Sequence, residues 1–371
     1  MRASLHTIRR TTTTTTKGTE VKRVLLALLA LVLVAGVAAG AWYWNRERRI
    51  DAFARTPVTL ASPAIVNVAP GTGPRALATQ LAQAGVVNDA ELAYLYIRRE
   101  NLGPKLKAGE YYFEGTLTPP EALERIRTGT VRVYRFTVPE GLRAEEILPI
   151  VAASPLGLDR AQLERLAADP AFLHKVGVPA DSIEGFLFPD TYTFTRSATP
   201  ESVLTKMVQR TLEEYRKADA QRQAGVTLDL LQTVTLASII EKETGQPQER
   251  PHISCVFHNR LKQGMQLATD PTVIYAMRLL RGVYSKNITA KDLRTPHPYN
   301  TYLTKGLPPG PIASPGAAAL QAALNPLQDC KDLFFVSRND GTHIFCPTYE
   351  CHQAAVQQWQ VEYFRKKKRG G

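Results

Sequence analysis

With 371 residues and a hydrophobic content of 44%, the chain is long enough for two modest domains with hydrophobic cores. Its net charge of +12 comes from the two ends, because residues 1–49 hold nine Lys or Arg against two Glu, and residues 365–369 add five basic side chains. The body between them is balanced, which argues against a basic groove for nucleic acid.

Residues 24–44 form a run of 21 residues without a charge, and the run ends in Trp42, Tyr43 and Trp44. Such a run can cross a bilayer core, and these aromatic residues are typical of the membrane interface. A cleaved signal peptide is the alternative, but its apolar core is normally about 7–15 residues long. Six basic residues precede the run and three follow it closely. We therefore expect a retained single-pass anchor whose N-terminus lies in the cytoplasm.

The region after the anchor alternates short strands and helices. We expect strands at 66–68, 106–113 and 131–138, and helices at 75–84, 89–100 and 119–129. A Pro-Glu-Gly turn at 139–141 with a helix at 147–152 echoes the earlier turn at 70–73, which suggests a repeated strand–turn–helix unit. The pattern predicts a small α+β domain.

The second half also predicts an α+β fold. We expect helices at 159–168, 200–218, 251–263 and 349–364, and a strand pair at 333–337 and 342–346. A polar region rich in proline and glycine, from 269 to 316, is too long for an ordinary connection. Loops of that length are usually functional or disordered.

An apolar helix that begins near Asp229 and ends before Gly245 carries two carboxylates in its last turn. Glu243 lies seven residues after Leu236 and continues the apolar stripe, whereas Glu241 lies roughly 160° around the helix. A carboxyl group on an apolar face, near the negative end of the helix dipole, is expected to have a raised pKa. A general acid that works near neutral pH needs such a pKa. The alternative is that both acids face solvent.

Polar side chains in the region from 269 to 316 are suited to binding a sugar. Tyr299, Asn300 and Tyr302 offer two aromatic rings that can stack and an amide that can form paired hydrogen bonds. Asp270 precedes a proline at a predicted helix start, where an N-cap role is the alternative.

An aromatic stretch near residue 188 holds further candidates. Glu184 and Tyr192 are candidate substrate contacts, and Asp190 is a further acid between them. For the two acids, a structural role is the favoured interpretation.

The four cysteines could form disulfides if the body lies outside the membrane. Their positions are Cys255, Cys330, Cys346 and Cys351. A Cys330–Cys346 disulfide would close the predicted strand pair. Metal binding with His343 and His352 is the alternative, but no Cys-x-x-Cys or His-Glu-x-x-His spacing is present, so we expect no metal site.

Eight motifs, taken in order, resemble the YceG-like family of endolytic murein transglycosylases. They are EGFLFPDTY, ASIIEKET, VFHNRL, TDPTVIY, YNTY, GLPPGPIASPG, F-V-x-x-x-x-G-x-H-x-F and TYECHQAAV. The resemblance runs from about Ile65 to about Phe364. Ala268 departs from it, because family members commonly have Gln there.

This resemblance implies a LysM-like domain followed by a catalytic domain that cleaves peptidoglycan glycan strands within the chain. It implies that Glu243, the second Glu of EKET, is the catalytic acid, and that no cofactor is needed. It places the body on the periplasmic side of the bacterial inner membrane, with peptidoglycan synthases (penicillin-binding proteins) as candidate partners.

The expected product carries a 1,6-anhydro ring, because the sugar's own C6 hydroxyl takes the place of water. Two alternatives stay open. One is a membrane-tethered scaffold that binds peptidoglycan without cleaving it. The other is a muramidase that uses water, which would need a second carboxylate about 6.5–9.5 Å away if it inverts. Glu184 or Asp190 is the nearest candidate in the sequence.

The expected organisation has six segments. They are a cytoplasmic tail at 1–23, a transmembrane helix at 24–44, a stalk at 45–62, a LysM-like domain at 63–138, a catalytic domain at 139–364 and a basic tail at 365–371.

Overall fold

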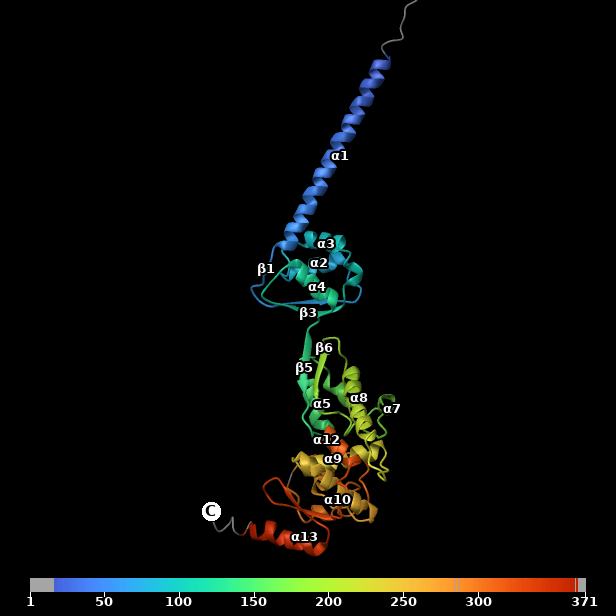
Figure 1. The fold of residues 1–371 in the computed structure, drawn as a ribbon, viewed down its shortest axis with the longest axis vertical. Coiled ribbons are helices and arrows are strands. Elements are labelled where there is room, and N and C mark those ends of the chain that lie inside the picture. Colours follow the sequence, from blue (N-terminus) through green and yellow to red (C-terminus); the bar gives the residue numbers. More distant parts are fainter. Residues whose placement is uncertain (1–16, 284, 286, 364, 366–371) are drawn as a thin grey trace, which may run out of the picture. The chain divides into compact units, whose positions relative to one another are not determined.

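The computed structural model describes residues 17–283, 285, 287–363 and 365 (Figure 1). The predicted cytoplasmic tail lies outside the described residues up to residue 16, and the predicted basic tail lies outside them except for Arg365. The fold is mixed α+β, as predicted. The chain divides into two compact units, residues 1–132 and 133–371.

The first unit begins with one long helix, α1 (Lys17–Arg55), which contains the apolar run (Figure 1). By length and composition its residues 22–55 can cross a membrane. The helix continues through residues 45–55, which we expected to belong to a stalk. Ile50 and Phe53 are buried there, because side chains three residues apart share one helix face. Most of the expected stalk is therefore part of the folded unit.

The rest of the first unit follows the predicted order of strands and helices. Its elements are β1 (Val58–Thr59), β2 (Ala64–Val68), α2 (Pro74–Gln83), α3 (Ala90–Arg99), β3 (Gly109–Phe113), β4 (Thr116–Leu117) and α4 (Pro119–Thr128). The ladders β1–β4 and β2–β3 are antiparallel. A capping box between Thr118 and Glu121 begins α4, and Gly129, with φ +78°, ends it. Phe53 of α1 joins the hydrophobic core of this unit.

The second unit begins with β5 (Val133–Thr137), which pairs antiparallel with β6 (Thr191–Thr195). Sequence analysis placed this strand at the end of the first domain. Its partner comes from 58 residues further along the chain, so local pattern alone did not reveal where it belongs.

Helices make up most of the second unit. They are α5 (Ala144–Ala152), α6 (Arg160–Ala167), α7 (Pro170–Val176), α8 (Pro200–Asp219), α9 (Leu230–Glu243), α10 (Arg250–Lys262), α11 (Asp270–Arg281) and α12 (Ala317–Leu324). The antiparallel hairpin β7 (Phe334–Ser337) and β8 (His343–Cys346) follows, then α13 (Tyr349–Val356) and a π-helical turn (Gln357–Glu362). Helices α10, α11 and α12 pack against α9, which places α9 at the centre of the unit.

The region from 269 to 316 contains α11 (Asp270–Arg281), as the predicted helix start at Asp270 indicated. One expectation about the second unit was wrong. The disulfides are Cys255–Cys330 and Cys346–Cys351, not Cys330–Cys346. Asn259 of α10 explains the difference, because its side-chain amide donates to the carbonyls of Cys330 and Asp332, at 3.2 and 3.0 Å. These bonds bring Cys330 to α10 and not to the hairpin.

Candidate active site

The centre of the candidate site is the C-terminal end of α9. Asp229 caps its N-terminus in a capping box with Gln232, and residues 233–240 are all buried. The helix ends at Glu243, because Thr244 has an extended backbone. These bounds confirm the predicted helix, and the last turn presents Glu241 and Glu243 in different surroundings.

Glu243 is half-buried, and burial of its carboxyl group away from water raises its pKa to about 7. The hydroxyl of Thr269 donates a hydrogen bond to Glu243 Oε1 and lowers the pKa. The charge of Asp270 raises the pKa, and the guanidinium of Arg260 lowers it. At neutral pH this carboxyl group is therefore close to half protonated and able both to give and to take a proton.

Glu241 is a structural acid. Its Oε1 accepts from Arg250 Nη2 at 2.7 Å and its Oε2 accepts from the Gly316 amide at 3.0 Å. The side chains of Glu241 and Arg250 are only 6% and 7% exposed. This buried pair ties the end of α9 to the starts of α10 and α12, so the two acids of one helix turn have different roles.

Thr269 is held in place by a polar cluster between two of the motifs. Its amide donates to Thr301 Oγ1 at 3.2 Å, and the hydroxyls of Thr272 and Thr301 lie 2.7 Å apart. The preceding Ala268 has φ +45°, which is uncommon for a residue other than glycine, and its amide donates to Thr301 O at 3.0 Å. Thr269, which sequence analysis did not single out, is thereby presented to Glu243.

Asp270 and Tyr302 lie beside Glu243. The Tyr302 hydroxyl donates to Asp270 Oδ1 at 2.7 Å. The charge of Asp270 raises the pKa of Glu243. Burial raises the pKa of the Tyr302 phenol, and the charge of Glu243 raises it further. Asp270 is the first residue of α11 and Thr269 is its N-cap, so the alternative N-cap role for Asp270 was wrong.

Arg260 of α10 is the second functional candidate that sequence analysis did not single out. Its Nε donates to Leu333 O at 2.6 Å and its Nη1 donates to Leu267 O. These carbonyls fix the guanidinium within electrostatic range of Glu243 and Tyr302. The sequence signal that could have indicated Arg260 is the arginine of the VFHNRL motif.

Asn300 has a structural role. It is fully buried, and its side-chain amide donates to the carbonyls of Leu293 and Thr295 at 3.1 and 2.9 Å. Its side-chain oxygen accepts from the Tyr302 amide at 3.1 Å. This side chain organises the loop that carries Tyr302, so we do not retain it as a sugar ligand.

Tyr192 and Glu184 are also used within the fold. Tyr192 is a core residue of β6 whose hydroxyl donates to Phe188 O at 2.7 Å. Glu184 accepts from the amides of Ala144 and Gly185 at 3.1 and 3.2 Å, at the start of α5. Burial nevertheless raises the Glu184 pKa to about 7. The structure therefore gives neither residue a free group for substrate.

Tyr299 stays a candidate for a sugar contact. It is half-buried, and its ring lies 4.9 Å from that of Tyr275, measured between centroids. Tyr275 also lines a cavity of about 440 Å³. Glu243 is not among the lining residues, but its neighbour Lys242 is, and so is Pro271, which follows Asp270. The cavity therefore adjoins the end of α9 without containing the carboxyl group.

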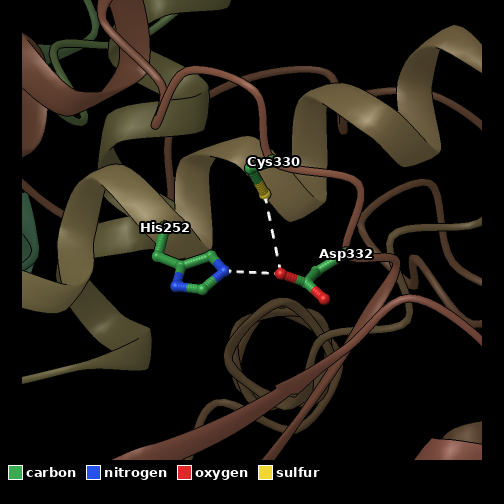
Figure 2. A group of neighbouring side chains, drawn as sticks. All are labelled: His252, Cys330 and Asp332. Carbon is green, nitrogen blue, oxygen red and sulfur yellow. Dashed lines mark hydrogen bonds and ion pairs between the residues drawn. The ribbon is translucent and has the colours of Figure 1, made fainter.

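The group of metal-ligand side chains found among the described residues is His252, Cys330 and Asp332, and it includes no residue of the Glu243 site (Figure 2). The chemistry that the Glu243 site offers is acid–base catalysis by one carboxyl group of raised pKa, beside an exposed carboxylate and a guanidinium.

Comparison with known proteins assigns the class. The model of the YceG-like family matches residues 66–358, so the chain belongs to the YceG-like family. A relative from Bacillus subtilis, named endolytic murein transglycosylase, is 30% identical over 314 residues, which cover 79% of this chain and 84% of the relative. A relative of the same name from Streptococcus pneumoniae is 26% identical over 362 residues. The match covers 90% of this chain and 64% of that relative.

A crystal structure of a YceG-like protein from Listeria monocytogenes is similar to this chain. The identity is 30% and the TM-score is 0.51, with 79% of this chain and 99% of that chain covered.

Proposed function

We propose that this chain is an endolytic lytic transglycosylase that cleaves the glycan strands of peptidoglycan, with Glu243 as its catalytic acid and base. Membership of the YceG-like family and the names of the relatives support the reaction and the substrate class. The observation that carries the choice of residue is the half-buried Glu243 carboxyl group, whose pKa of about 7 suits proton transfer in both directions.

The proposed reaction has two proton transfers and consumes no water. Protonated Glu243 donates to the oxygen between N-acetylmuramic acid and N-acetylglucosamine, and the bond from that oxygen to the anomeric carbon breaks. The Glu243 carboxylate then accepts the proton of the muramic acid C6 hydroxyl while O6 bonds to the anomeric carbon. The ring closes as a 1,6-anhydro sugar, and Glu243 is again protonated for the next cycle.

Thr269 and Asp270 support these steps. The Thr269 hydroxyl occupies Glu243 Oε1, which leaves Oε2 to face the substrate. The Asp270 carboxylate, held by Tyr302, favours the positive charge that develops at the anomeric centre. Tyr299 and Tyr302 are the proposed sugar contacts.

The alternative hydrolase would need a second acid, and the structure changes where to look for it. Glu184 is engaged by backbone amides, and Asp190 pairs with Arg210 at 3.2 Å. Asp270 is the carboxylate whose charge acts on Glu243. Glu184 also has a raised pKa, so what favours catalysis over a scaffold that only binds peptidoglycan is the names of the relatives and the Asp270 carboxylate beside Glu243.

We also propose the arrangement of the chain at the membrane. Residues 24–44 of α1 cross the bacterial inner membrane once, residues 1–23 lie in the cytoplasm, and residues 63–364 lie on the periplasmic side. The length of α1 and the excess of basic residues before the span support this topology. Residues 63–132 act as a LysM-like glycan-binding domain, residues 133–364 carry the catalysis, and peptidoglycan synthases (penicillin-binding proteins) are the proposed partners.

Mass spectrometry of peptidoglycan digested by the purified full-length chain tests the proposal. We expect new ends that carry 1,6-anhydro-muramic acid, and none with Glu243→Gln. Reducing ends in their place would indicate a hydrolase, and the second acid would then be sought at Asp270. Intact glycan that stays bound to the protein would favour the scaffold.

A further inference from the structure

Three metal-ligand side chains from two segments meet beside α10, where the ligand atoms of His252, Cys330 and Asp332 lie within 4.8 Å of one another. His252 and Cys255 lie three residues apart on α10 and so share one face. Cys330 and Asp332 come from the loop after α12, and Figure 2 shows the His252 ring and the Cys330 sulfur both directed toward the Asp332 carboxylate. His252 Nε2 lies 2.7 Å from Asp332 Oδ2, and Cys330 Sγ lies 3.8 Å from the same oxygen. Cys255 and Cys330 are joined by a disulfide.

This arrangement does not depend on the disulfide alone. Asn259 holds the loop by the carbonyls of Cys330 and Asp332, and Arg260 holds the next carbonyl, that of Leu333, at 2.6 Å. The His252 ring stacks on Phe345, with 3.5 Å between the ring centroids. When the sulfur–sulfur bond is broken, we expect these contacts to keep the Cys330 thiol next to the His252–Asp332 pair, while Cys255 stays on the adjoining face of α10.

We propose that the reduced form of this cluster is a zinc site, with His252, Cys255, Cys330 and Asp332 as its four ligands. Zinc favours four tetrahedral ligands, at about 2.3 Å for sulfur and about 2.0–2.2 Å for nitrogen and oxygen, so neighbouring ligand atoms lie about 3.3–3.8 Å apart. Cys330 Sγ and Asp332 Oδ2 already have such a separation. The His252–Asp332 pair needs to separate by about 0.6 Å. The Cys255 sulfur, which lies outside the group of atoms within 4.8 Å of one another, needs to leave Cys330 Sγ and move toward His252 and Asp332.

Conversion of the Cys255–Cys330 disulfide to the zinc site balances with a dithiol as the reductant. The dithiol gives two electrons and two protons to the Cys255–Cys330 bond and is itself oxidised to a disulfide. Zn²⁺ then displaces the two thiol protons to solvent and binds the thiolates. Because the disulfide consumes both sulfur ligands, the metal and the disulfide exclude each other. Either one links α10 to the loop at 330–332.

Sequence spacing did not reveal this site, because its ligand pairs are 75 residues apart. The second disulfide, Cys346–Cys351, provides a control within the same chain. Among the described residues, no histidine and carboxylate are gathered at ligand distance around it. Reduction of that pair should therefore create no comparable site.

Cobalt titration of the full-length chain tests the proposal. The protein with Cys346→Ser and Cys351→Ser is reduced with a dithiol, freed of it without oxygen, and titrated with Co²⁺. We expect one equivalent to bind, with the near-ultraviolet thiolate band and the strong visible bands of tetrahedral cobalt, and Zn²⁺ to displace it. The oxidised protein and the protein with Cys255→Ser and Cys330→Ser should bind none.

Single substitutions then identify the other two ligands. His252→Gln and Asp332→Asn should each weaken Co²⁺ binding at least about tenfold, and circular dichroism of each variant checks that it is folded. The Asp332→Asn result decides alone if His252→Gln does not fold. Absence of one-equivalent binding by the reduced protein would overturn the proposal, and so would equal affinity in the folded ligand variants.

Discussion

Replacing Glu243 by Gln should stop turnover and, at the same time, stabilise the folded protein above pH 7. The pKa of this carboxyl group is raised from its usual 4.5 to about 7 in the folded chain. A raised pKa means that the proton stabilises the fold. That contribution is complete below pH 4.5 and is lost as the pH rises through 7. The rise from 4.5 to about 7 corresponds to at most about 3.5 kcal/mol, since one pKa unit is about 1.4 kcal/mol. Solvent screening of the half-buried residue reduces this value.

The measurement compares the free energy of unfolding of the two proteins, full length in detergent, between pH 4.5 and 8. The Glu184 carboxyl group, whose pKa is also raised to about 7, titrates in both proteins, so only the difference between them is informative. We expect no difference near pH 4.5, and Glu243→Gln to be more stable by up to about 3.5 kcal/mol at pH 8. Turnover should fall about 10²–10⁴-fold or more. Equal stability at both pH values would refute the argument that burial raises this pKa.

Three further substitutions separate the roles around Glu243. Glu241→Gln breaks a buried ion pair and should lower the free energy of unfolding by about 3–5 kcal/mol. The folded fraction should keep its activity. Loss of activity in folded protein would mean that Glu241, and not Glu243, is the catalytic acid. Thr269→Val removes a hydrogen bond that lowers the Glu243 pKa, so the fall in activity with rising pH should move to higher pH. Asp270→Asn removes a charge that raises the same pKa, so this limb of the pH–rate profile should move to lower pH. Shifts in the same direction, or none, would contradict the electrostatic account.

The sequence was most informative where structure is local. The caps and the apolar period of α9 defined its bounds, because both depend on neighbours within a few residues. The same period separated Glu241 from Glu243, and the structure gives the two acids different partners. The eight motifs identified the family for the same reason: each is a short, contiguous pattern.

The sequence was least informative where contacts join distant segments. Thr269 reaches Glu243 across 26 residues, and no local pattern marks that contact. Asn300 and Tyr192 have side chains suited to sugars, but the fold uses those groups for its own backbone. The Cys255–Cys330 disulfide joins segments that are 75 residues apart, and Asn259 holds Cys330 beside α10.

Isotope labelling tests the central claim most directly. Peptidoglycan digested by the full-length chain in water enriched in ¹⁸O should give products whose new muramic acid ends are 1,6-anhydro and contain no ¹⁸O, because O6 of the same sugar attacks the anomeric carbon. Cleavage that places ¹⁸O on the anomeric carbon would show that water is the nucleophile and would contradict the one-carboxylate mechanism.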